Sequence, residues 1–238
     1  MRCTTLVLAF LIPLAVAFSM GCAHERTTSA LALTDKTAIG TWTLTDSENT
    51  TFDVIIDPDG SAISNWSKGP TKAQGEQGSW KIERGRLVID YTDGWRDVVV
   101  PTHDGHYAKE GFAPGAARDG AATNIGFSAR TSDADAQWVG VYEIPEGLSS
   151  GSTSFFVAIQ SSHTAWKSID TPNVGSWWIK RSALRIRWAN GWLDELTPSG
   201  NGYTVRSWEP GTPLDFTGEP TVEPTSEGVG KRFRVGKP

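Results

Sequence analysis

Apolar and polar residues alternate one by one over short stretches of this chain. Over residues 87–91 the order is Leu, Val, Ile, Asp, Tyr, and over residues 184–188 it is Leu, Arg, Ile, Arg, Trp. Alternate side chains of an extended strand point to opposite faces, so each segment has one apolar and one mostly polar face. This pattern is typical of half-buried antiparallel strands. Beyond the first 22 residues we find no amphipathic helical period, so the pattern predicts an all-β protein.

The two alternating segments belong to a longer unit that occurs twice. Residues 78–97 (GSWKIERGRLVIDYTDGWRD) align without a gap on residues 175–194 (GSWWIKRSALRIRWANGWLD), and about half of the positions are identical. Further matches extend the copies to about 40–115 and 140–211, which indicates two homologous units. We predict two antiparallel β-meanders, barrel- or sandwich-like, of six or seven short strands each. They should share a core or an interface, because a unit of about 75 residues is only marginally stable alone.

Turn residues and aromatic residues recur at matching places in the two copies. Asp93-Gly94 and Asn190-Gly191 are dipeptides that favour a type I′ hairpin turn, in which both central residues take positive φ. We interpret the repeated residues as structural. They are Trp80, Gly94, Trp95, Asp97, Trp177, Gly191, Trp192 and Asp194.

Two patterns resemble known families. Gly-Ser-Trp followed by Asp/Asn-Gly-Trp-x-Asp resembles Trp-rich repeats of uncharacterised exported bacterial proteins; this resemblance covers most of both copies and implies no activity. Gly40-Thr41-Trp42, on the first expected strand, is similar to the Gly-x-Trp of lipocalin-like barrels. In the second copy Tyr142 stands in place of that Trp. The lipocalin-like resemblance implies a barrel of antiparallel strands.

The first 22 residues resemble a bacterial lipoprotein signal peptide, an expected signal helix. Arg2 precedes a nearly unbroken apolar run over residues 5–18, which is short for a membrane span but fits a signal peptide. Residues 19–22, Ser-Met-Gly-Cys, place a small residue before the cysteine that would carry lipid. The alternative is cleavage after residues 15–17, Ala-Val-Ala. We favour lipidation of Cys22, because the alternative leaves one unpaired thiol in an oxidising compartment.

Composition divides the rest of the chain. The segment between the copies is rich in Ala, Gly, Ser and Thr, and the segment after the second copy is rich in Pro and Glu. We do not expect the second of these to pack. The expected organisation is a lipoprotein-type signal peptide at 1–22, a tether at 23–38, β-repeat 1 at 39–116, a linker at 117–137, β-repeat 2 at 138–212 and a tail at 213–238.

The charge balance and the missing motifs exclude several functions. The formal net charge is −5, so nucleic acid is not an expected partner, because binding a phosphate backbone needs an excess of Lys and Arg. Both cysteines lie within the first 22 residues, which excludes thiol catalysis in the folded part. His103 and His106 bracket a tight turn without an evident third ligand, so we predict neither a metal nor a cofactor.

Asp97 and Asp194 are candidates for chemistry because they occupy matching places in the two copies. A buried carboxylate is costly unless it is paired or hydrogen-bonded. Arg84 and Arg181 share the strand parity of the core residues, so we expect Arg–Asp contacts, or bonds from turn amides, and a structural role. The alternative is a carbohydrate-active envelope hydrolase in which both carboxylates flank one sugar at about 5–10 Å. A duplicated carboxylate argues against this alternative, because it supplies no distinct acid and base.

Trp178 differs from the repeated Trp residues because its counterpart is Lys81. Neighbours on a strand face opposite sides, so we expect Trp177 in the core and Trp178 exposed on a charged face. An exposed Trp is a candidate platform for a sugar, a peptide or a protein interface. We therefore consider Trp178 a ligand-binding residue.

These observations together predict a non-catalytic lipoprotein of the cell envelope. It would bind a ligand or act as a scaffold, on the periplasmic or the outer side, and its lipid anchor would hold it to a membrane. An envelope glycan or a protein is the expected partner. Secretion as a soluble protein is the alternative.

The leader generates a testable prediction. Mass spectrometry of the N-terminus of the protein purified from its native membranes should find a diacylated Cys22, because the cysteine follows a signal-like apolar run. An unmodified chain that begins at Phe18 would contradict lipidation.

Overall fold

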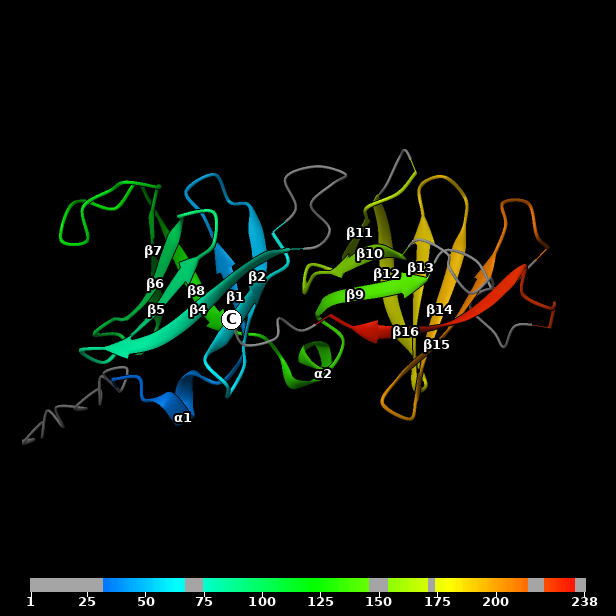
Figure 1. Ribbon diagram of the computed structural model, residues 1–238, viewed down its shortest axis with the longest axis horizontal. Helices are drawn as coiled ribbons and strands as arrows, with labels where there is room; N and C mark the ends of the chain where they lie inside the picture. The colour runs from blue at the N-terminus through cyan, green and yellow to red at the C-terminus, as the bar shows by residue number, and fades with distance from the viewer. Residues whose placement is uncertain (1–31, 67–74, 146–153, 171–173, 214–220, 234–238) are drawn as a thin grey trace, which may run out of the picture.

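The computed structural model describes residues 32–66, 75–145, 154–170, 174–213 and 221–233. Within these ranges the chain forms two closed barrels of eight antiparallel strands each, which lie one after the other along the long axis (Figure 1). The expected signal peptide and Cys22 lie outside the described residues. The prediction of an all-β protein built from two similar units is confirmed.

Each barrel is an up-and-down meander, in which consecutive strands pair and the last strand pairs with the first. Barrel 1 follows helix α1 (Asp35–Ala38) and consists of β1 (Gly40–Thr45), β2 (Thr51–Ile56), β3 (Ser61–Ser64), β4 (Glu76–Glu83), β5 (Arg86–Tyr91), β6 (Arg96–Pro101), β7 (Tyr107–Phe112) and β8 (Asn124–Arg130). Barrel 2 follows helix α2 (Asp133–Ala136) and consists of β9 (Gly140–Pro145), β10 (Ser154–Ile159), β11 (Thr164–Lys167), β12 (Val174–Lys180), β13 (Ala183–Trp188), β14 (Leu193–Ser199), β15 (Gly202–Trp208) and β16 (Ser226–Arg232).

The expected linker and tail each contain the strand that closes a barrel. β8 lies within 117–137 and pairs with β1, and β16 lies within 213–238 and pairs with β9. The prediction of six or seven strands a unit was therefore wrong, and so were these two boundaries. The reason is that the inward positions of both strands carry small or polar residues, whereas apolar side chains point outward. The outward Ile125, Phe127 and Val229 are 62%, 74% and 70% exposed.

Each barrel has its own core inside the closed sheet. The alternating residues of the repeat point inward as predicted, and Leu87, Ile89, Leu184 and Ile186 are fully buried. Trp177 is also buried in the core of barrel 2. The two-residue period of the sequence therefore identifies the inner face of these strands.

A short helix, an aromatic side chain and an arginine close one end of barrel 1. Trp42 of β1 donates from Nε1 to the carbonyl of Ala38 in α1 at 2.8 Å. The Arg130 guanidinium, at the end of β8, lies 4.3 Å from the centre of the Trp42 ring and donates to the carbonyls of Ile39 and Thr37. The final residues of the expected tether thus form a structural plug rather than a free segment.

Barrel 2 repeats this closure with different atoms. Tyr142 takes the place of Trp42, and its hydroxyl donates to the carbonyl of Trp138 at 2.6 Å. Arg232, at the end of β16, donates to the carbonyls of Ala136 and Val139. Both plugs lie on the same side of the molecule (Figure 1). The Gly-x-Trp position is therefore structural in both copies, and a Tyr can fill it.

Residues 221–225 of the expected tail pack on the outside of barrel 2. Trp208 points outward from β15, yet it is buried, and its Nε1 donates to the carbonyl of Val222 at 3.0 Å. The amide of Glu209 donates to Thr225 Oγ1 at 3.1 Å. The expectation that the Pro-rich segment does not pack was wrong for these residues. They shield the outward-pointing Trp208 of β15 from solvent.

The two barrels meet through a polar interface centred on Asp53 of β2, which is buried on the outer face of barrel 1. Its carboxylate accepts hydrogen bonds from the amide and hydroxyl of Ser161, in barrel 2, at 2.9 and 2.6 Å. Asn65 Nδ2 donates to the carbonyl of Ile159 at 2.9 Å. The units therefore share an interface and keep separate cores.

The turns that contain Gly94 and Gly191 differ from the predicted type. Only the glycines take positive φ, +89° and +92°, whereas Asp93 does not. The amide of Gly94 donates to the carbonyl of Tyr91 at 3.1 Å. This is a type I turn followed by a left-handed glycine, the G1 bulge, rather than a type I′ turn. Each turn still favours a glycine, because one of its residues, Gly94 or Gly191, takes positive φ.

We expect Gly94→Val and Gly191→Val each to lower the free energy of unfolding by about 1 kcal/mol or more, because a β-branched residue resists positive φ. An added Cβ would also lie 3.2 Å from Pro114 Cβ or 3.1 Å from Pro210 Cβ. Chemical denaturation measures the loss. Gly94→Asn is the matched control and should cost less, since Asn tolerates left-handed φ. Unchanged unfolding of both valine variants would contradict the assignment.

Candidate functional site

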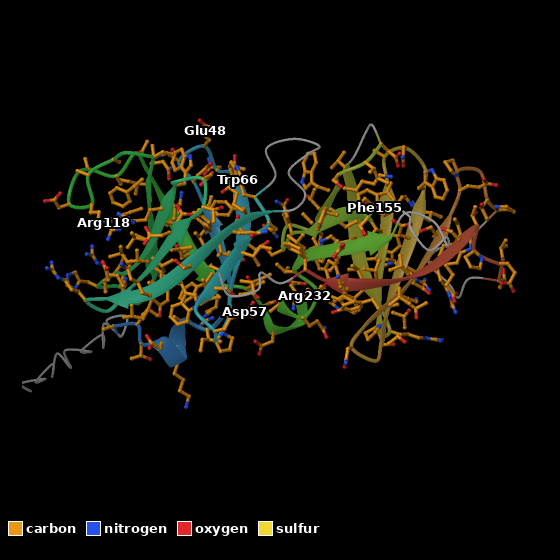
Figure 2. All side chains as sticks on the ribbon, viewed as in Figure 1. Glu48, Asp57, Trp66, Arg118, Phe155 and Arg232 are labelled. Carbon is orange, nitrogen blue, oxygen red and sulfur yellow. The ribbon has the colours of Figure 1, made fainter. Side chains whose placement is uncertain are left out.

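Each barrel has a cavity at the end opposite its plug. The cavity of barrel 1 has a volume of about 360 Å³ and that of barrel 2 about 290 Å³. Asn124 and Ser226, which begin β8 and β16, line the two cavities, while the plugging arginines end the same strands. Figure 2 shows Glu48 and Trp66, at the mouth of barrel 1, on the side away from Arg232. Among the residues that the structure describes, each lumen thus has a plug at one end and a cavity at the other.

A buried ion pair lies at the bottom of the barrel 1 cavity. Lys109 Nζ of β7 lies 3.2 Å from Asp97 Oδ1 of β6, and both side chains are less than a tenth exposed. Tyr91 donates from its hydroxyl to Asp97 Oδ2 at 3.2 Å, and Lys109 donates to Asn124 Oδ1 at 2.5 Å. Burial and the neighbouring Asp97 carboxylate raise the pKa of Tyr91. The network neutralises the charge of Asp97 inside the sheet.

Barrel 2 places its carboxylate in the same position but satisfies it differently. Trp188, the counterpart of Tyr91, donates from Nε1 to Asp194 Oδ2 at 2.6 Å. Lys167 of β11 lies over the Trp188 ring, 4.9 Å from its centre, and bonds Asp170 at 2.5 Å. Burial raises the pKa of Asp194, and bonds from Ser207 and Trp188 oppose that shift. Both lumens therefore hold an aspartate and a lysine, but the lysines come from different strands.

The predicted Arg–Asp contacts do not form. Arg84 and Arg181 occupy exposed turns with φ of +52° and +55°. Positive φ turns these residues out of the regular strand, so strand parity does not predict where their side chains lie. The cations near the aspartates are Lys109 and Lys167 instead. Asp97 and Asp194 are buried and satisfied, as a structural role requires.

The two aspartates line separate cavities, one in each barrel. A glycosidase needs its two carboxylates on either side of one bond, about 5–10 Å apart. Two lumens that are each enclosed by their own sheet do not supply that arrangement. Asp97 and Asp194 therefore do not flank one bond within the described residues.

Aromatic side chains surround both mouths. Trp95 and Phe52 line the cavity of barrel 1, and Trp192 and Phe155 hold the matching places in barrel 2. Trp95 and Trp192 are half-buried and also pack against the cores. Trp66 adds a third ring to barrel 1, at 4.9 Å and 79° from the Phe52 ring. The repeated Trp residues after the glycine turns thus face the openings.

The other predicted structural Trp residues lie away from the mouths. Trp80 is half-buried, and its Nε1 donates to the carbonyl of Asp57 at 2.7 Å. Trp177 Nε1 donates to the carbonyl of Gln160 at 2.7 Å, and its ring stacks on His163 with 4.4 Å between centres. Each ring anchors a neighbouring hairpin to the barrel.

Trp178 lies on the outer face of β12, opposite in direction to Trp177, as predicted. It pairs in register with Arg185 and is half-buried rather than fully exposed. The Arg187 guanidinium lies 5.9 Å from the centre of its ring, which covers part of the indole. Trp178 lines neither lumen cavity.

His103 and His106 lie exposed at the β6–β7 turn. Among the residues that the structure describes, no group of three or more His, Cys, Asp or Glu side chains is arranged to hold a metal ion. The turn itself is stabilised by the Asp104 carboxylate, whose pKa is lowered by the Thr102 hydroxyl and the His106 amide.

The sequence analysis did not identify several residues of the candidate site. Phe52 and Phe155, like Tyr91 and Trp188, recur in the alignment of the copies, so comparison of the repeats offered a signal for them. The lysines offered none. Val205 occupies the place of Lys109, and Ser64 occupies that of Lys167. Only the closed sheet brings these strands to one lumen.

Over the described ranges, the fold and the cavities define a tandem of up-and-down β-barrels, each with a plug at one end and a cavity at the other. Comparison with protein-family models, curated proteins and solved structures finds no match for this chain. In the part of the chain that the structure describes, no helix has the length and apolar character to cross a membrane. The residues at the mouths are therefore the basis for inferring function.

Replacing Trp177 or Trp178 with Ala tests which of the two side chains supports the folded structure. We expect Trp177→Ala to lower the free energy of unfolding by about 3–5 kcal/mol, as for other buried aromatics. Trp178→Ala should cost about 1 kcal/mol or less, because its ring lies outside the sheet. Urea denaturation of both variants measures the difference. Equal losses would show that Trp178 belongs to the packed structure and is not a platform.

Proposed function

We propose that this chain is an exported, non-catalytic binding protein that holds a small ligand in the mouths of its barrels. The observation that carries the proposal is the open cavity at the end of each lumen. In both barrels it has aromatic walls and a floor where a buried aspartate is already satisfied. Such concave sites, mostly apolar with a few placed polar groups, are where small molecules bind.

The architecture supports this proposal. An eight-stranded barrel has an interior just wide enough for packed side chains or one small ligand, and lipocalins use up-and-down barrels in this way. Gly40-Thr41-Trp42 is similar to their Gly-x-Trp. The volume of about 360 Å³ in barrel 1 lies at the small end of the range for ligand sites, about 300–1,000 Å³, and that of about 290 Å³ in barrel 2 lies just below it. A compact molecule or one end of a longer molecule fits best.

The state of the carboxylates supports a non-catalytic role. Asp97 is bonded to Lys109 and Tyr91, and Asp194 to Trp188. General acid–base catalysis needs a carboxyl group within reach of the substrate proton and with a fitting pKa. Here both carboxylates are bonded to side chains of their own barrel.

The leader supports a place in the cell envelope. Cys22 would carry the lipid, and residues 23–32 would connect the membrane to the plug of barrel 1. A scaffolding role is the second candidate, with an envelope glycan or a protein as partner. Trp178 favours it, because a half-buried indole beside Arg187 on an outer face resembles an interface anchor.

Binding of N-phenyl-1-naphthylamine, an uncharged fluorescent probe, tests the proposal. We expect saturable binding that weakens by about tenfold or more in the double variant Thr123→Trp/Ser226→Trp, since these residues line the two mouths and the larger ring would fill them. The matched control is Ile125→Trp/Val229→Trp, which places the same ring on exposed outward positions of β8 and β16 and should bind like the parent. No saturable binding, or equal loss in both double variants, would contradict the proposal.

A further inference from the structure

The strands that join the two barrels also carry an aromatic wall of each cavity. On β2, Asp53 bonds barrel 2 from the outer face, while its neighbour Phe52 lines the cavity of barrel 1. On β10, the carbonyl of Ile159 accepts from Asn65 of barrel 1, while Phe155 lines the cavity of barrel 2. We propose that the interface joins the two mouths into one bivalent site for a single elongated ligand with a compact apolar group at each end. The inference rests on the proposed function and names the class of its ligand.

The two cavities lie on the same side of the molecule. Figure 2 shows Glu48 and Trp66, which line the cavity of barrel 1, and Phe155, which lines that of barrel 2, on one side. Arg232 of the second plug lies on the other side, where both plugs are found (Figure 1). Two groups of one ligand can therefore enter the two cavities from the same direction.

The interface sets the distance between the two aromatic walls. Phe52 and Phe155 occupy matching places in the repeat, and each points into its own lumen, away from the interface. Two packed sheets lie about 10 Å apart, and an inward ring on each side brings the separation of the two rings to about 20 Å. The two apolar groups of the ligand should be separated by a similar distance.

Hydrogen bonds from both barrels hold this spacing. The carboxylate of Asp53 is 1% exposed and accepts from the amide and the hydroxyl of Ser161 at 2.9 and 2.6 Å. Thr43 Oγ1 and Asn65 Nδ2, on its own barrel, donate to the same carboxylate at 2.8 and 3.0 Å. Separating the barrels would remove two donors from a buried charge, which is costly. With the mouths held in place, the second contact of a bivalent ligand becomes intramolecular, and this raises its affinity without any new contact.

The repeat supplies a variant that weakens the interface and keeps the turn. Ser161 holds the place that Pro58 has in the matching turn of barrel 1. Ser161→Pro therefore removes both donors to Asp53 and introduces a residue that this kind of turn already contains. The matched control is Ser162→Asp, which copies Asp59 of barrel 1 at an exposed position of the same turn.

The experiment compares N-phenyl-1-naphthylamine with dimers in which a spacer joins two copies of this probe, all on the full chain. A dimer whose spacer reaches about 20 Å should bind about tenfold or more tighter than the single probe, and one that reaches about 10 Å should bind like the single probe. Native mass spectrometry should find one long dimer, or two single probes, on each chain. Thr123→Trp or Ser226→Trp, each of which blocks one mouth, should reduce the long dimer to the affinity of the single probe.

The interface variants then test what holds the two mouths at this spacing. Ser161→Pro should lower the affinity of the long dimer severalfold and leave that of the single probe unchanged, which also shows that both barrels remain folded. Ser162→Asp should change neither affinity. The inference is overturned if the long dimer binds no tighter than the single probe, if its advantage survives the block of one mouth, or if Ser161→Pro keeps the full advantage. In those cases the binding proposal stands, whereas a failure of the single probe to bind would remove both.

Discussion

Closure of each sheet by its last strand is the constraint on which the rest of this structure depends. A strand at the edge of an open sheet exposes unpaired amides and carbonyls, and closure removes both edges. β8 and β16 achieve it, although their inward residues are mostly small or polar. Their pairing also brings Arg130 and Arg232 to the helices at one end, so the same strands that close the barrels hold the plugs. One end is thereby filled, and a cavity lined by described residues lies at the opposite end.

The buried aspartate inside each lumen is the main electrostatic cost of the fold. An aspartate inside a sheet loses its hydration, which costs free energy unless a partner replaces the water. Both copies have an aspartate at this position, but the group that bonds to its carboxylate differs between them. Asp97 has Lys109 from β7, and Asp194 has the indole of Trp188, with Lys167 of β11 nearby. Because a barrel brings every strand to one interior, a cation from either strand can serve.

The outer surfaces show a similar exchange at matching positions. Val88, Val98 and Phe112 form a small apolar cluster on the outside of barrel 1. Barrel 2 has Arg185, Glu195 and Trp208 in these places, and the first two form a buried ion pair at 2.8 Å. A buried pair of this kind is not a strong source of stability, because the desolvation of both charges offsets their attraction. The duplicated backbone thus tolerates different chemistry on both faces, which lets the two mouths differ.

The sequence by itself determined the fold class, the duplication, the inner face of the central strands and the glycine turns. These follow from local rules: side chains alternate with a period of two, and positive φ favours glycine. Only the tertiary structure decided which strands close the barrels, which lysine meets each aspartate, and that Asp53 joins the units. β8 and β16 have no inward apolar pattern, so their place depends on backbone pairing with strands more than 80 residues earlier in the chain. Contacts between residues so far apart in sequence leave no periodic trace, because they are set by closure of the whole sheet.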